Sequence, residues 1–198
     1  MAVVARISLL LLLITSFLFP KYLINEYLIS PKAAKVVESI SNELYKKSSI
    51  NLYTIATVKK VGEGVNLFDY IKNNYKDLKE PYIVFFFAPN SKRIGIIPSN
   101  KELRELYSPS MVKDYAISIL AYNDKNSLQS KYDVAVVQAV SELADEIASK
   151  KGIKLKNTIK EEGRWIIKLI TYIVYFGSII VIWIFILRPL LNRIRNGK

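Results

Sequence analysis

The feature that most constrains this chain is a long apolar segment near its C-terminal end. Trp165 to Leu187, WIIKLITYIVYFGSIIVIWIFIL, contains 23 residues and one charged side chain, Lys168. A helix rises about 1.5 Å per residue and needs roughly 20 apolar residues to cross the hydrocarbon core of a bilayer. Because a chain of 198 residues is too short to bury a helix that is apolar all round, the pattern predicts a transmembrane helix over 165–187.

The N-terminal segment is apolar as well. Ile7 to Leu13 is apolar except for Ser8 and follows a single arginine, which is typical of an export signal. No small-x-small cleavage motif follows, and this favours an uncleaved signal anchor over 1–24, with a cleaved signal peptide as the alternative. We therefore predict an inner-membrane protein with cytoplasmic termini, including a basic tail over 188–198, and with residues 25–160 in the periplasm.

The segment between the two apolar ends is long enough for one domain. Its strongest signal is YIVFFFAPNSKRIGIIPS, from Tyr82 to Ser99. The apolar run from Tyr82 to Phe87 is too short to cross a bilayer, so the stretch predicts a strand, a turn and a second strand from Arg93 to Ile97. Because the first strand does not alternate apolar with polar residues, we expect it in the centre of a sheet, covered on both faces.

The surrounding pattern predicts helices. The segment 66–75 begins with Asn66, a good helix cap, and repeats apolar residues at helical spacing. Together with strands over 51–60 and 82–87 it forms a βαβ unit, whose strands are parallel. Further helices are predicted over 33–47, over 101–107, after a Ser110 cap with Met111, Tyr115 and Ile119 on one face, and over 133–150, following a loop over 123–133. The fold class predicted is α/β, a small three-layer α/β/α sandwich with a mixed sheet, flanked by the signal anchor and the transmembrane helix.

Four stretches of the middle segment resemble the TPM domain family: NLYTIATVKKVGEG, LFDYIKNNYK, PYIVFFFAPNSKRIGIIPS and YDVAVVQAVSELADEIA. The resemblance covers residues 33–150. This family includes thylakoid-lumen, photosystem-repair and receptor-modulating proteins and many bacterial membrane-anchored proteins. The resemblance implies an extracytoplasmic α/β/α domain tethered to a membrane, and some members have been proposed to be acid phosphatases or to bind divalent cations. This chain has DLKEPY before the central strand, in place of the acidic, glycine-containing stretch of many members.

Few residues of the chain suggest chemistry. It contains neither histidine nor cysteine, so any catalysis would use Asp, Glu, Ser, Thr, Lys or Tyr. Asp133 is a candidate ligand for Mg²⁺ or Ca²⁺, although its place at the start of a predicted helix also suits an N-cap. Lys92 and Arg93 at the hairpin turn could attract phosphate, with solvated turn charges as the alternative. Gly177 and Ser178 would let another helix approach the apolar segment.

These observations predict an accessory protein rather than an enzyme. The net charge of +12 is spread over scattered lysines, and the sequence has no basic stripe with interleaved aromatic residues that would indicate nucleic-acid binding. We expect no cofactor, and we expect the lipid bilayer and an integral-membrane complex as partners. The function predicted is to assist the assembly, stability or regulation of that complex. The alternative is a metal-assisted acid phosphatase at the membrane surface, using Mg²⁺ or Ca²⁺.

The predicted topology is testable with reporter fusions. Alkaline phosphatase fused after Gly152 is expected to be active, because the export signal carries this part of the chain out of the cytoplasm. An inactive fusion at that position, together with an active cytoplasmic reporter, would reverse the predicted arrangement.

Overall fold

The computed structural model of the chain describes residues 21–123, 125–159, 175–183, 185 and 188. The chain divides into two compact units, 1–159 and 160–198, which are described separately below. Most of the predicted signal anchor, more than half of the predicted span and nearly all of the basic tail therefore lie outside the described residues. Among the residues that are described, no helix combines the length and the apolar character needed to cross a membrane.

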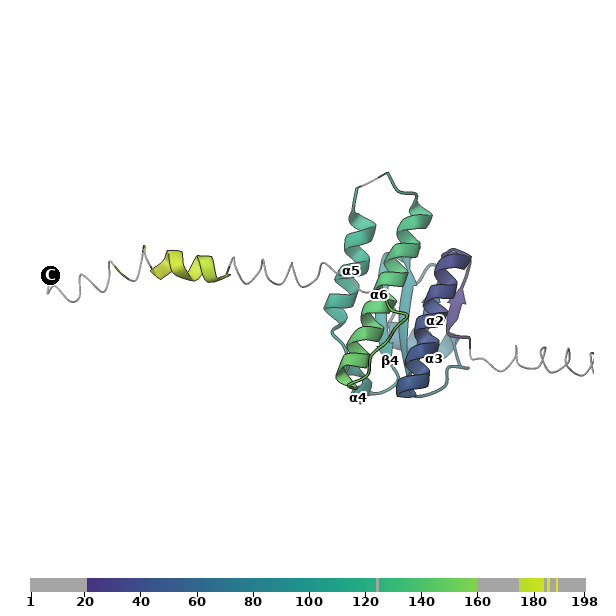
Figure 1. The fold of residues 1–198 in the computed structure, drawn as a ribbon. Coiled ribbons are helices and arrows are strands. Elements are labelled where there is room, and N and C mark those ends of the chain that lie inside the picture. The colour runs from purple at the N-terminus through teal and green to yellow at the C-terminus, as the bar shows by residue number, and fades with distance from the viewer. Residues whose placement is uncertain (1–20, 124, 160–174, 184, 186–187, 189–198) are drawn as a thin grey trace, which may run out of the picture. The chain divides into compact units, whose positions relative to one another are not determined.

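A four-stranded mixed sheet lies at the centre of the first unit (Figure 1). Strands β1 (Leu23–Asn25), β2 (Asn51–Ala56) and β3 (Tyr82–Ala88) are parallel neighbours. A short 3₁₀ turn, η1 (Pro89–Ser91), connects β3 to β4 (Arg93–Pro98), which pairs antiparallel with β3. The structure confirms the predicted mixed α/β fold, the parallel βαβ unit and the antiparallel hairpin.

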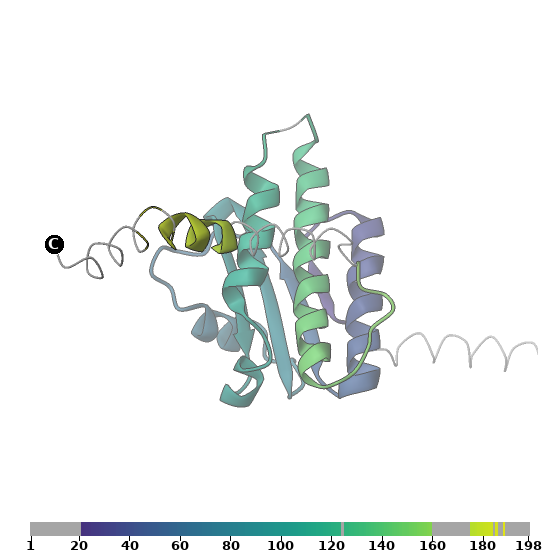
Figure 2. The same ribbon diagram turned by 60° about the vertical axis from the view of Figure 1, so that its left-hand side comes forward.

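Helices cover both faces of this sheet. On one face lie α2 (Pro31–Ser48), α5 (Pro109–Ala121) and α6 (Leu128–Lys150), which Figure 2 shows side by side in front of the strands. On the other face lies α3 (Leu67–Asn74), whose N-cap is the predicted Asn66. A single-turn helix, α4 (Lys101–Arg104), follows β4.

Strand β3 divides the core into two parts. Ile83, Phe85 and Phe87 pack in the cluster that contains α2, α5 and α6. Val84 and Phe86 pack in the cluster that contains α3. All five side chains are fully buried, which confirms that the strand is central and covered on both faces.

Several boundaries differ from the sequence prediction. Strand β2 ends at Ala56 and not at residue 60, and α4 ends at Arg104 and not at residue 107. Strand β1 was not predicted, because Leu23–Asn25 is only three residues long and continues directly from the N-terminal apolar segment. Helix α6 begins at Leu128 and not at Asp133, because the Ser127 hydroxyl accepts the N–H of Ser130 at 3.2 Å and so provides a cap that precedes Asp133 in the sequence. The predicted loop over 123–133 is correspondingly shorter.

The buried face of α5 also differs from the prediction. The helix begins at Pro109, after Ser108, so Ser110 is not its cap. Val112 and Ala116 are fully buried, whereas Met111 is 44% exposed. Met111 and Tyr115 are four residues apart, and so are Val112 and Ala116. Packing of α5 against α6 determines that the second pair is the buried one.

The core predicts the cost of truncating β3. Phe85→Ala should lower the free energy of unfolding by about 3 to 5 kcal/mol, because it removes a fully buried ring from a close-packed cluster. Urea unfolding of the full chain, followed by circular dichroism, measures this change. Phe68→Ala on α3 is the matched control, since Phe68 is 44% exposed and its truncation should cost about 0.5 kcal/mol or less. Equal losses for the two variants would contradict the packing described.

Candidate functional site

Three parallel strands end at one edge of the sheet, which we call the carboxyl edge. Strands β1, β2 and β3 are followed there by the segments 26–30, 57–66 and 89–92. In open α/β sheets, ligands bind outside the carboxyl ends of the strands, among the loops that follow them. Strand β4 runs in the opposite direction and begins at this edge, which places Lys92 and Arg93 here as well.

The Arg93 side chain binds the protein's own backbone. Its Nη1 donates to the carbonyl of Gly62 at 3.0 Å, and its Nη2 donates to the carbonyl of Val65 at 2.7 Å. The guanidinium group therefore holds the connection between β2 and α3 close to β4. Lys92 is exposed and takes a left-handed backbone conformation, with a φ of 51°, at the end of η1. A phosphate could approach Lys92 directly but would compete with two carbonyl groups for Arg93.

Asp133 lies inside α6, away from the start of the helix. Its Oδ1 accepts the backbone N–H of Ser30 at 2.8 Å and the Nε2 of Gln129 at 3.0 Å. Because Ser30 is the N-cap of α2, Asp133 fixes the chain where it passes from β1 into α2. The N-cap role considered for Asp133 is wrong, since Ser127 caps α6.

Asp133 borders a cleft of about 230 Å³ between α2 and α6, which Ile159 also lines. The described part of the chain contains no group of three or more Asp, Glu, His or Cys side chains that could hold a metal ion. Asp133 and Arg93 belong to opposite margins of the sheet, because one contacts the end of β1 and the other begins β4. These margins are three strand spacings, or about 14 Å, apart, so the structure does not bring the two residues into one site.

Glu26 forms a polar cluster that the sequence did not predict. Its Oε2 accepts the hydroxyl of Thr57 at 2.6 Å, and its Oε1 lies 2.7 Å from Nζ of Lys59. The hydrogen bonds from Lys59 and Thr57 hold the pKa of Glu26 below its ordinary value of 4.5. Thr57 is fully buried and follows β2, whereas Glu26 follows β1. The hydrogen bond between Thr57 and Glu26 depends on the pairing of β1 with β2, and no local sequence pattern indicates it.

The most exposed large apolar side chains among the described residues of the first unit also lie at this end of the domain. Tyr27 is 98% exposed, Tyr122 is 68% exposed and Leu128 is 61% exposed; we call these three residues the exposed tip. Tyr122 and Leu128 flank the connection between α5 and α6, which extends past the sheet in Figure 1. The loop that carries Tyr27 is tied to α6, because Gln129 Nε2 donates to the carbonyl of Leu28 at 2.8 Å.

Asn25 determines the conformation of the loop that carries Tyr27. Its Oδ1 accepts the N–H groups of Leu28 at 2.9 Å and of Ile29 at 3.1 Å, and its Nδ2 donates to the Ile29 carbonyl at 2.8 Å. Tyr27 has a φ of 61°, a left-handed conformation that is uncommon for a residue of its size. The hydrogen bonds of Asn25 thus hold the backbone in a strained turn whose tyrosine faces solvent.

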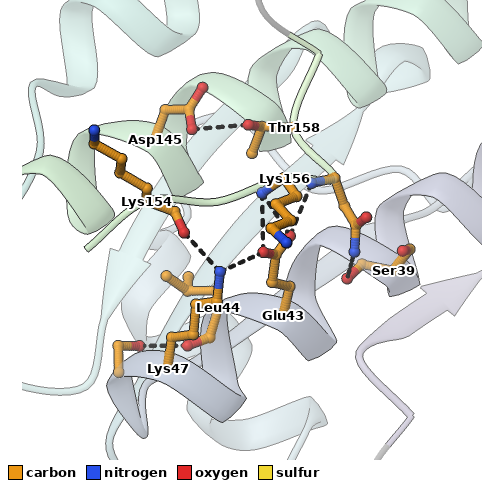
Figure 3. Close-up of polar contacts among 10 residues, drawn as sticks. Ser39, Glu43, Leu44, Lys47, Asp145, Lys154, Lys156 and Thr158 are labelled. Atoms are coloured by element: carbon orange, nitrogen blue, oxygen red, sulfur yellow. Dashed lines mark hydrogen bonds and ion pairs between the residues drawn. The ribbon is translucent and has the colours of Figure 1, made fainter.

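Residues 151–159, which we call the return strap, run back from the end of α6 past α2 (Figure 3). Glu43 of α2 binds the strap through three backbone contacts. Its Oε1 and Oε2 accept the N–H of Lys156 at 2.9 and 3.0 Å, and its Oε2 accepts the N–H of Asn157 at 2.8 Å. Lys47, one turn further along α2, lies 2.7 Å from Oε1 of Glu43 and neutralises its charge.

Two further contacts hold the return strap. Lys47 Nζ donates to the carbonyl of Lys154 at 2.6 Å, and the hydroxyl of Thr158 donates to Asp145 of α6 at 2.9 Å. Burial raises the pKa of the Glu43 carboxyl, but the hydrogen bonds from Lys47 and the strap backbone outweigh this effect and hold the pKa below 4.5. The strap is therefore bound most firmly when Glu43 is ionised.

Gly177 and Ser178 belong to the second unit, whose residues 175–182 are α-helical. Both residues are exposed, and a Cβ atom added to Gly177 would meet no atom within 4 Å. Large apolar side chains are exposed on the same short helix: Tyr175, Phe176, Ile179, Ile180, Val181, Ile182 and Trp183. Small residues among large apolar ones are typical of surfaces on which membrane helices pack together.

Three charged side chains at or next to the carboxyl edge are used in bonds within the domain. Glu26, Asp133 and Arg93 each direct charged atoms at groups of the protein itself. A general base or a metal ligand needs lone pairs that point at a substrate or an ion. The exposed tip, in contrast, presents apolar surface directly to whatever lies beyond this end of the domain.

No protein-family model matches the chain, and no curated protein matches it. One solved structure that the chain resembles is the solution NMR structure of the N-terminal domain of the cg2496 protein from Corynebacterium glutamicum. The two align with a TM-score of 0.46 and 11% sequence identity, over 73% of this chain and 86% of that one. This degree of likeness carries no argument about function.

The return strap predicts a local effect of removing the Glu43 charge. In Glu43→Gln the side chain keeps one acceptor oxygen for the two strap amides and loses its ion pair with Lys47. A hydrogen bond to a charged group contributes about 1.5 to 3 kcal/mol, so amide exchange at Lys156 and Asn157 should accelerate roughly 10- to 100-fold. Hydrogen–deuterium exchange of the full chain measures this change.

Glu38→Gln, on the same helix, is the control and should leave exchange in the strap unchanged. The effect of pH has a definite sign. Because folding lowers the pKa of Glu43, its contribution is complete above the ordinary value of 4.5 and is lost as the pH falls through the lower, folded pKa. Strap protection that does not change between neutral pH and strong acid, or that is equal in the two variants, would contradict the role of Glu43.

Proposed function

We propose that this protein is a membrane-anchored accessory protein whose α/β domain lies outside the cytoplasm, in the periplasm, and assists the assembly, stability or regulation of an integral-membrane complex. The segments 1–20 and 165–187 are its proposed anchors, since Leu23 and Ile24, which the sequence assigned to the first anchor, lie in strand β1. A three-layer domain of the TPM type is the proposed middle. The apolar composition of the two segments supports the anchoring.

One observation carries the functional part of this proposal. Glu26, Arg93 and Asp133, at or next to the carboxyl edge, direct their charged atoms at groups of the domain itself, while the same end exposes the apolar side chains of Tyr27, Tyr122 and Leu128. A domain built in this way can bind but has little with which to activate a substrate. A metal-assisted phosphatase, the alternative from the sequence, is favoured by no feature of the residues that the structure describes.

The return strap supports a close attachment of the domain to its C-terminal anchor. Glu43 and Asp145 hold the strap up to Thr158, so that only 160–164 separate the folded domain from the proposed span at Trp165. A short connection raises the effective concentration of the domain near other proteins of the same membrane. Weak contacts with a membrane neighbour would therefore be sufficient for function.

The proposed contact with the partner lies on the helix face around Gly177. Residues three and four apart share a helix face, and residues two apart do not. Val181 is thus on the face of Gly177, and Ile179 is on another face; the two side chains are 54% and 62% exposed. This pair allows a matched comparison on one short helix.

Site-specific photocrosslinking in cells tests the proposed function. A photoreactive phenylalanine analogue at position 181 should capture an integral-membrane protein that mass spectrometry identifies, and the same analogue at position 179 should capture it much less. Gly177→Leu should abolish the capture from position 181, because the larger side chain keeps the helices apart. Capture of no membrane protein from either position would contradict an intramembrane partner.

A further inference from the structure

We propose that the exposed tip, formed by Tyr27, Tyr122 and Leu128, is the surface with which the domain sits on the lipid bilayer. This inference rests on the proposed function in one respect, the anchoring of the chain by 165–187. It goes further by naming the end of the domain that faces the membrane and the side chains that enter the interfacial zone.

The chain that connects the domain to the proposed span is short. Ile159 is the last described residue of the first unit, and Trp165 begins the apolar segment. Six residue steps of fully extended chain span about 20 Å at most. The surface of the domain around Ile159 must therefore lie within that distance of the point where the proposed span enters the bilayer.

Ile159 lies against α2 and α6. Ile159 is 43% exposed and lines the cleft between α2 and α6 together with Ser30, Asp133 and Val134. Leu128 is six residues before Val134 on α6, which is about 9 Å along a helix. The N–H of Ile159 donates to Ser141 Oγ, 13 residues after Leu128, so the backbone of Ile159 lies about 20 Å from Leu128 along α6. The six residue steps after Ile159 can span a similar distance, so the proposed span can enter the bilayer at the level of the exposed tip.

The side chains of the exposed tip suit the interfacial zone of a bilayer. Tyr27, Tyr122 and Leu128 have the highest exposed fractions of the large apolar side chains described between residues 21 and 159. Tyrosine is enriched where membrane proteins meet the headgroup region, because its ring is apolar and its hydroxyl remains hydrated. The opposite end of the domain carries Met111 near the start of α5, with an exposed fraction of 44%.

Hydrogen bonds hold the backbone of the exposed tip in place. Asn25 fixes the turn that presents Tyr27, and Gln129 ties this turn to the first turn of α6, next to Leu128. Lys131 Nζ donates to the carbonyl of Tyr122 and so ties the end of α5 to α6. Backbone segments that are already held in place lose little further conformational freedom when their side chains enter the interface.

The absence of cysteine from the chain allows a direct test. Single-cysteine variants of the full chain, Tyr27→Cys, Leu128→Cys and the control Met111→Cys, would each carry an environment-sensitive fluorophore. The proteins are reconstituted, with the domain outside, into vesicles of phosphatidylcholine and phosphatidylglycerol. Two quenchers are compared, a nitroxide attached near the headgroup of the lipid and iodide in the water.

The expected result is a loss of emission with the lipid-borne nitroxide for the labels at 27 and 128, and protection of the same labels from iodide. The label at 111 should show the opposite pattern. Labels at 27 and 128 that iodide quenches and the nitroxide lipid does not would overturn the inference. Protection from both quenchers would also overturn it, because a protein, such as a second copy of this chain, would then cover the tip.

Alkaline extraction of the same vesicles separates this inference from the proposed function. A chain that alkali removes from the vesicles is not anchored, and the proposed function fails together with the inference. A chain that resists extraction but whose labels at 27 and 128 remain exposed to water is anchored, and only the inference about the tip fails.

Discussion

A β-strand that is apolar on both faces has to be covered on both faces, and β3 imposes this requirement on the whole domain. Its side chains alternate between two clusters, with Phe85 in one and Phe86 in the other, and both rings are fully buried. The helices α2, α5 and α6 cover one side, and α3 covers the other. Since β2 is parallel to β3, the crossover through α3 follows from the same requirement. The order of layers is thus a consequence of one strand.

The parallel arrangement also decides where the polar groups meet. Loops that follow β1, β2 and β3 share one edge, and long-range hydrogen bonds stabilise them there: Glu26 to Thr57, Arg93 to Val65, and Ser30 to Asp133. Each bond uses a charged side chain to hold a loop in position. These bonds hold the loops in position, and the side chains exposed at this end include the apolar Tyr27 as well as the charged Lys60, Glu63 and Lys92. Rigidity of this kind lowers the entropy cost of docking on another surface.

The sequence predicted the parts of the fold that local patterns determine. The helix that became α3, its cap at Asn66 and the β3–β4 hairpin all followed from spacing and turn residues. Strand β1 did not, because three residues that continue an apolar run have no period of their own. The buried face of α5 did not follow from the sequence, because Met111 with Tyr115 and Val112 with Ala116 have the same four-residue spacing. The partners of Arg93 and Asp133 are 28 and 103 residues away, respectively, and no local pattern records such contacts.

The central claim is that the domain stands on the bilayer with its carboxyl edge toward the lipid. Resonance energy transfer from donors on the domain to acceptors in the lipid headgroups measures this orientation most directly. A donor at position 127, in the connection that precedes α6, should lie closest to the membrane, and a donor at position 102, in α4 at the other end of β4, should lie farthest from it. Transfer that is stronger from position 102 than from position 127, or equal from both, would contradict the account.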